Sequence, residues 1–98
     1  MGDVFRIIWT DQAVESLRDI YDYFKDKSPQ GAANVLHDLL NSPKAIVFAQ
    51  QFQIDDINPK YRRIVVRNYK VLYREDGKTI YIIDIVSTHQ SPEVLQRR

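Results

Sequence analysis

The sequence predicts an α+β fold, a helical hairpin packed on one face of a mainly antiparallel four-stranded sheet in the order β-α-α-β-β-β. Two amphipathic helical segments meet at Ser28-Pro29. The following stretch, Tyr61–Val86, is rich in Ile, Val, Tyr and Thr, which suit a half-buried pleated sheet. The short apolar segment Val4–Trp9 is expected to be the first strand in the chain, which brings the sheet to four strands. At 98 residues, the chain is expected to form a single domain spanning 1–98.

The composition is that of an ordinary globular protein, with 44% hydrophobic and 28% charged residues. The absence of cysteine excludes disulfide bonds and thiolate chemistry. The N-terminal MGDVFRIIW is too short and too charged for a signal peptide, and no apolar run is long enough to span a bilayer. We therefore expect a cytoplasmic protein without a membrane partner. The net charge of +1 identifies no partner, but positive charge is concentrated from Lys60 onward.

The first helix is predicted to follow Thr10, whose hydroxyl can cap its N-terminus, with Asp11 at the positive end of the helix dipole. Its apolar residues recur at the spacing of one helical face. They are Val14, Leu17, Ile20, Tyr21 and Phe24. The opposite side is mainly acidic, which is typical of a solvated face.

The second helix is predicted to begin at Ser28-Pro29, with serine as the N-cap and proline in the first turn. Its expected buried stripe consists of Ala32, Ala33, Leu36, Leu39 and Leu40. A kink or short helix is expected from Pro43 to Ala49. In the polar connection that follows, Asp55-Asp56 are expected to serve a loop or a cap, and a general base is the less favoured interpretation.

Alternation along Tyr61–Tyr73 predicts a β-hairpin with two different faces. Side chains two apart along a strand share a face of the sheet. We expect a two-residue turn at Arg67-Asn68, because Asn68 tolerates positive φ, and this turn sets the pairing of the two strands. Val66 then pairs with Tyr69, Ile64 with Val71 and Arg62 with Tyr73. The apolar face holds Ile64, Val66, Tyr69, Val71 and Tyr73, with Arg62 at its rim. The other face, here called the basic face, holds Arg63, Val65, Arg67, Lys70, Leu72 and Arg74.

The third strand of the meander can join this hairpin in two registers. A two-residue Asp76-Gly77 turn would place Asp84 on the apolar face, beside Ile80 and Ile82. A three-residue Asp76–Lys78 loop would instead place Tyr81, Ile83 and Ile85 there, and Asp84 among the cations. We favour the longer loop because an unpaired buried carboxylate is costly. Beyond the strand, Ser91-Pro92 is expected to begin a last short helix.

The basic face is the candidate functional surface, since the sequence has no glycine-rich phosphate loop, nucleophile elbow or metal-ligand motif and no cofactor is expected. Arginine binds phosphate oxygens, and imidazole can move a proton near neutral pH. The candidate residues for binding a target or nucleic acid are Lys60, Arg62, Arg63, Arg67, Lys70 and Arg74, with His89 just beyond the last strand. A merely solvated, charged sheet face, with Glu75 and Asp84 as local partners, explains the same pattern equally well.

The element order, together with YRRIVVRNYKVLYRE and DIVSTHQSPEVL, resembles the RelE/ParE family of bacterial toxins. The resemblance extends from Ile7 to Leu95. Its most specific parts are Tyr61-Arg62, Asn68–Tyr73 and His89–Leu95. It implies the toxin half of a type II toxin–antitoxin pair, of which some members cleave mRNA on the ribosome and others inhibit DNA gyrase.

Several residues match family positions. Arg62 or Arg63 matches the arginine that opens the second strand, and spacing leaves both open. Lys70 stands where the third-strand motif commonly has arginine or lysine, and His89 where relatives often have arginine. If the protein is an endoribonuclease, the resemblance implies His89, Arg63 and Arg74 as catalytic residues. No tyrosine follows His89, unlike the better-known ribosome-dependent nucleases, which slightly favours the ParE-like branch.

The resemblance therefore predicts a growth-inhibiting toxin, of the kind associated with plasmid stabilisation, that a cognate antitoxin neutralises. Its target is gyrase or ribosome-bound mRNA, with gyrase favoured, and whether the chain is an enzyme stays open. The alternative is a non-toxic binding module of the same fold that docks a partner through its basic sheet face.

Overall fold

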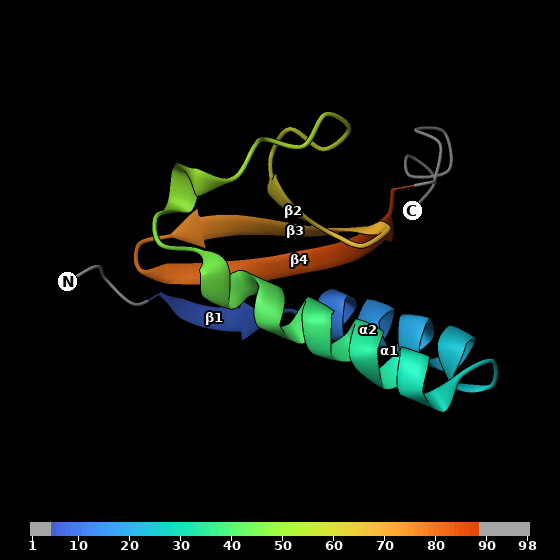
Figure 1. The fold of residues 1–98 in the computed structure, drawn as a ribbon. Coiled ribbons are helices and arrows are strands. Elements are labelled where there is room, and N and C mark those ends of the chain that lie inside the picture. Colours follow the sequence, from blue (N-terminus) through green and yellow to red (C-terminus); the bar gives the residue numbers. More distant parts are fainter. Residues whose placement is uncertain (1–4, 89–98) are drawn as a thin grey trace.

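Two helices cover one face of a four-stranded sheet in the computed structural model, which describes residues 5–88 (Figure 1). The predicted order of elements and the α+β class are confirmed. His89 and the helix expected at Ser91-Pro92 lie outside the described residues. No helix within residues 5–88 combines the length and the apolar character that crossing a membrane requires.

The sheet has the strand order β1-β4-β3-β2, with one parallel pair at its edge. β1 runs parallel to β4, while the other neighbouring strands are antiparallel. The elements are β1 (Arg6–Trp9), α1 (Asp11–Lys25), α2 (Pro29–Asn41), the 3₁₀ turns η1 (Ser42–Ala45) and η2 (Ala49–Gln51), β2 (Arg62–Val66), β3 (Tyr69–Asp76) and β4 (Thr79–Ser87). The helical hairpin between β1 and β2 carries the chain across the sheet, so β1 pairs with the last strand.

Both predicted helix caps are present. Thr10 Oγ1 accepts a hydrogen bond from the Ala13 N–H at 3.3 Å and donates to the Ile82 carbonyl at 2.7 Å. It therefore caps α1 and also attaches the helix start to β4. Ser28 Oγ accepts from the Gly31 N–H at 3.0 Å, with Pro29 opening α2 as expected.

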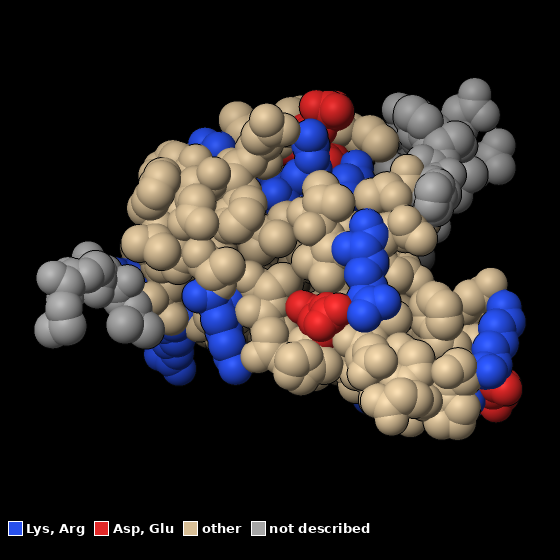
Figure 2. All heavy atoms as spheres, viewed as in Figure 1, with Lys and Arg blue, Asp and Glu red and all other residues tan. Residues whose placement is uncertain are grey.

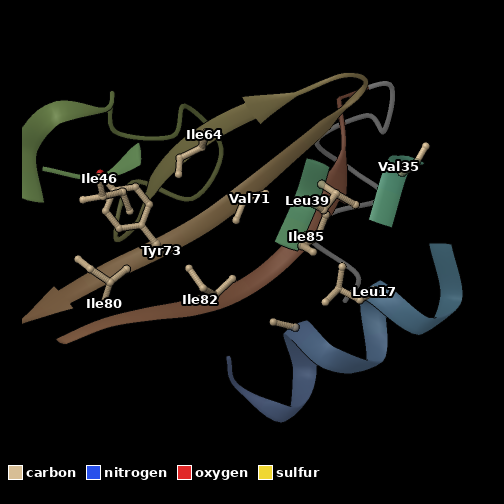
Figure 3. Close-up of a cluster of buried hydrophobic side chains, with 11 residues drawn as sticks. Leu17, Val35, Leu39, Ile46, Ile64, Val71, Tyr73, Ile80, Ile82 and Ile85 are labelled. Atoms are coloured by element: carbon tan, nitrogen blue, oxygen red, sulfur yellow. The ribbon is translucent and has the colours of Figure 1, made fainter. Parts of the chain in front are cut away.

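The hydrophobic core lies between the sheet and the helices (Figure 3). It joins Leu17 of α1 and Leu39 of α2 to Val71, Tyr73 and neighbouring side chains of β3 and β4. The predicted helix stripes are only partly right, because the buried faces are narrower than the apolar patterns. Val14, Tyr21, Ala33 and Leu40 are exposed, while Ala13, Ser16 and Val35 are buried in their place. Each helix contacts the core along one row of side chains three or four apart, and the exposed apolar residues lie beside that row.

The first hairpin of the meander has the predicted register. Arg62 pairs with Tyr73, Ile64 with Val71 and Val66 with Tyr69. The positive φ of the turn falls on Arg67, at 55°, and not on Asn68 as predicted. The turn still has two residues, so the apolar face of the hairpin packs on the core as expected.

The predicted Asp76–Lys78 loop is wrong, because Asp76 pairs with Thr79 across a two-residue turn at Gly77 and Lys78. Ile80 and Ile82, and not Tyr81 and Ile83, therefore point into the core. The alternative Asp76-Gly77 turn is not observed either, although it correctly placed Ile80 and Ile82 in the core. A β-bulge shifts the pairing between Tyr73, opposite Ile82, and Leu72, opposite Asp84. The extra residue at the bulge returns the next side chains to the required faces, so Ile85 also enters the core while Asp84 stays off it.

Candidate functional site

The predicted basic face is partly covered by the connection between α2 and β2. Ile57 and Tyr61 of this connection pack on a small apolar cluster formed by Leu72, Val86 and Ile83 on the sheet face opposite the helices. The connection is the green to yellow segment above the sheet in Figure 1. The face is therefore not the open row of cations that alternation predicted.

Lys70 lies under this connection in a buried ion pair. Its Nζ is 2.7 Å from Asp55 Oδ1, and the exposed fractions of the two side chains are 11% and 0%. Asp55 Oδ2 also accepts hydrogen bonds from the Ile57 and Asn58 N–H groups, at 3.1 and 2.8 Å. Burial acts to raise the pKa of Asp55, but Lys70 and the two N–H donors together hold it below its ordinary value. Asp55 does serve a turn as predicted, whereas the predicted exposure of Lys70 is wrong.

Arg63 holds the same connection from β2. Its guanidinium donates to the Ile54 carbonyl at 3.0 Å and to the Gln53 side-chain oxygen at 3.1 Å. Its Nη1 also lies 3.7 Å from Asp55 and 3.5 Å from Asp56. The donors of Arg63 are therefore directed to this chain's own acceptors, which gives the residue a clear structural role.

Arg67 points to the helices. At the turn between β2 and β3, its Nε donates to Asp38 Oδ2 of α2 at 2.8 Å. The nearby guanidinium is the main reason that the pKa of Asp38 lies below its usual range. Arg67 therefore links the hairpin tip to α2 and does not belong to the basic face.

The remaining three predicted cations meet at one end of the sheet. Lys60, Arg62 and Arg74 line a cavity of about 240 Å³, here called the β3-edge cavity. Its other lining residues are Ala49, Gln50, Tyr73 and Glu75. β2 begins at Arg62, opposite Tyr73, so the last residues of β3 extend past the end of β2. The cavity lies beside this overhanging end of β3.

Neighbouring groups orient two of these cations. Arg62 Nη1 donates to the Phe52 carbonyl at 2.8 Å, which keeps its head at the rim of the core as predicted. The Arg74 guanidinium lies over the Tyr81 ring, 4.4 Å from its centroid. Three cations and one carboxylate thus surround a small hollow, which is an arrangement that can bind a carboxylate or a phosphate.

Of the three residues that the resemblance implies for a nuclease, the structure describes two, and each of these has another partner. Arg63 is engaged with the connection, Arg74 stacks on Tyr81, and His89 lies outside the described residues. Residues 5–88 hold no cluster of three His, Asp or Glu side chains that could bind a metal ion. The ion pairs Asp55–Lys70 and Asp38–Arg67 were not anticipated from sequence, because their partners are 15 and 29 residues apart and no local pattern links them.

Comparisons with known proteins agree with this fold. Residues 7–92 match the family described as the ParE toxin of type II toxin–antitoxin system, parDE. A solved structure, described as the chromosomal ParDE TA system from P. aeruginosa, superposes with a TM-score of 0.72 and 22% sequence identity. The match covers 86% of this chain and 96% of that one, and at this identity it supports the fold alone. A search of curated proteins gave no match. Because the family match spans most of the sequence, the chain belongs to the ParE toxin family of type II toxin–antitoxin systems.

Proposed function

We propose that this chain arrests bacterial growth through an essential nucleic-acid-linked process, by inhibiting DNA gyrase in preference to cleaving mRNA. The observation that carries the proposal is the ParE family match over residues 7–92. Such a toxin acts in the cytoplasm, where a cognate antitoxin neutralises it.

The contacts of Arg63 support an inhibitor over a nuclease. RNA cleavage through the 2′-hydroxyl needs a base, an acid and cations that hold the phosphate. Arg63 already binds a carbonyl and two carboxylates of its own chain. Inhibition by binding requires no proton-transfer groups.

The antitoxin is expected to use an acidic segment that pairs with cations at the sheet. Charge-assisted hydrogen bonds between carboxylates and arginine also accelerate association. The candidate contacts are Arg63, Arg67 or Arg74, of which the first two already have carboxylate partners within the chain. Arg74, exposed at the β3-edge cavity, is therefore the contact that the structure favours most.

Growth and biochemical assays on the same protein test the proposal. Expression in a bacterial host should arrest growth, and co-expression of the adjacent gene product should restore it. Purified protein should inhibit supercoiling by gyrase and leave ribosome-bound mRNA intact. Arg74→Glu should weaken antitoxin binding, while Arg18→Glu, an exposed arginine on α1, serves as the matched control.

Two results would contradict the proposal. Cleavage of ribosome-bound mRNA with normal supercoiling would place the protein in the nuclease branch. Absence of growth arrest, with neither activity, would instead favour a binding module that has lost toxicity.

A further inference from the structure

The segment between η1 and η2 exposes two large apolar side chains in succession. Val47 and Phe48 are 59% and 56% exposed. Single exposed apolar residues are common on protein surfaces, whereas contiguous exposed apolar surface marks interaction sites. In Figure 2, a broad area without charged side chains lies over the segment between α2 and β2. We call Val47 and Phe48 the apolar tip.

The apolar tip stands between two buried residues. Ile46 on one side and Ala49 on the other are both buried against the core. The hydroxyl of Tyr73 donates to the Ala49 carbonyl at 2.8 Å. Burial raises the pKa of this tyrosine, so its hydroxyl remains a donor at neutral pH. The two ends of the tip are therefore fixed to the body of the protein.

Gln51 holds the tip from within the loop. Its side-chain oxygen accepts from the Val47 N–H at 2.7 Å, and its side-chain nitrogen donates to the Ala45 carbonyl at 3.0 Å. The Gln51 N–H also donates to the Phe48 carbonyl at 3.1 Å. These bonds pair the Val47 N–H and the carbonyls of Ala45 and Phe48, and they hold the loop in a conformation that leaves both apolar side chains exposed. A preorganised tip of this kind loses little conformational entropy when it binds.

The apolar tip adjoins the β3-edge cavity. Ala49 and Gln50, which follow Phe48 directly, form part of the cavity wall. Lys60 at the same cavity makes no ion pair or hydrogen bond with any other residue of the described part of the chain. Phe48 thus stands close to the cations of the cavity, and aromatic residues and arginine are both enriched at protein interfaces.

We propose that the apolar tip and the β3-edge cavity together form the surface by which this chain docks its protein target. The inference rests on the proposed function and locates the contact with gyrase. Phe48 enters an apolar recess of the target, and a carboxylate of the target enters the cavity beside Lys60 and Arg74. The complementary partner is therefore an acidic protein surface with an apolar recess.

The distribution of cations favours a protein over a nucleic acid. Binding along a phosphate backbone uses several cations that can release counterions. Arg63, Arg67 and Lys70 are instead already paired with carboxylates of the chain. The other three of the six candidate cations, Lys60, Arg62 and Arg74, line one compact hollow beside the apolar tip, which suits a single carboxylate.

Purified gyrase provides the probe, with binding measured by calorimetry and inhibition by the supercoiling assay. Phe48→Ala is expected to weaken binding about tenfold or more, as is typical for truncation of an aromatic hot spot. Lys60→Glu should also weaken binding, and the loss of affinity should be larger at low salt than at high salt because salt screens the charges. Val65→Ala on β2 is the matched control, since Val65 is 61% exposed and lies outside the tip and the cavity. Circular dichroism establishes that each variant is folded, and Val47→Asp provides a second disruption of the tip.

The outcomes separate failure of this inference from failure of the proposed function. If wild-type protein inhibits gyrase and both tip variants do so equally well, the docking surface is wrong and the function stands. If the tip variants lose affinity for a short DNA duplex but not for gyrase, the surface binds nucleic acid and the inference is overturned.

If wild-type protein arrests growth without inhibiting gyrase, the proposed target is wrong, and the growth assay decides the inference. Arrest by both tip variants would then overturn it, whereas loss of arrest with Val65→Ala still active would support it for another target protein. If wild-type protein causes no arrest, both proposals fail.

Discussion

Removing the carboxylate of Asp55 is expected to be among the most damaging single changes in this protein. Asp55→Ala leaves the Lys70 ammonium, which is almost fully buried, without its partner at 2.7 Å. It also leaves the N–H groups of Ile57 and Asn58 without their acceptor. Loss of one partner of a buried ion pair costs about 3–5 kcal/mol. Each unsatisfied N–H adds about 1–3 kcal/mol in principle. Because the connection can open and admit water, we expect the total to stay near 3–5 kcal/mol.

A double-mutant cycle identifies the ion pair as the cause. Lys70→Met removes the buried cation but leaves Asp55 its two N–H donors and Arg63 at 3.7 Å. Asp55→Ala combined with Lys70→Met should therefore be more stable than Asp55→Ala alone, since no unpaired ammonium remains buried. The exposed neighbour gives the control, because Asp56→Ala should change the free energy of unfolding by less than about 0.5 kcal/mol.

Urea unfolding followed by circular dichroism measures these differences. An Asp55→Ala protein whose free energy of unfolding lies within about 1 kcal/mol of wild type would contradict the role assigned to the ion pair, because a broken buried pair costs more. That role would equally be refuted if the two single changes were additive in the double variant, because that would show no coupling between the partners.

The remaining predictions concern the effect of pH, a core leucine, a helix cap and a glycine in a turn. Folding lowers the pKa of Asp55 below its ordinary value of 3.8. The stability that Asp55 contributes is therefore fully present above pH 3.8 and is lost as the pH falls through the lower folded pKa. The urea midpoints of wild type and Asp55→Ala should accordingly converge in acid. Leu39→Ala should cost about 2–5 kcal/mol, whereas Leu40→Ala on the exposed side of α2 should cost far less, as measured by urea unfolding. Thr10→Ala removes a cap and a link to β4, and should lower the free energy of unfolding by about 0.5–2 kcal/mol. Gly77 has φ of 62° and open space around it, so Gly77→Ala should cost about 1–2 kcal/mol through backbone strain alone, seen as a lower thermal midpoint.

Local sequence patterns were enough to predict the class of fold and the pairing of β2 with β3. Alternation places Ile64, Val71 and Tyr73 on one face, and a two-residue turn leaves a single register that keeps them together. The caps at Thr10 and Ser28 were also predictable, because a cap acts on N–H groups only a few residues away.

Patterns within one strand were not enough to place β4. The expected loop kept Asp84 away from the core at the cost of exposing Ile80 and Ile82. The protein instead turns at Gly77 and Lys78, which places Ile80 and Ile82 in the core, and it inserts a bulge opposite the Tyr73 to Leu72 step. The advantage of a bulge depends on the packing of a neighbouring strand and of α1, neither of which is visible in the alternation of β4 itself.

The candidate site shows the same division between sequence and tertiary structure. The sequence by itself determined that cations alternate along β2 and β3, and that Asp55 lies in a polar connection. Only the tertiary structure decided that this connection folds back onto the sheet, where Asp55 neutralises Lys70 and Lys60 remains beside Arg62 and Arg74. The physical reason is that side-chain periodicity follows from the geometry of one chain segment. Which charges are paired, buried or left available depends instead on contacts between segments that are distant in the sequence.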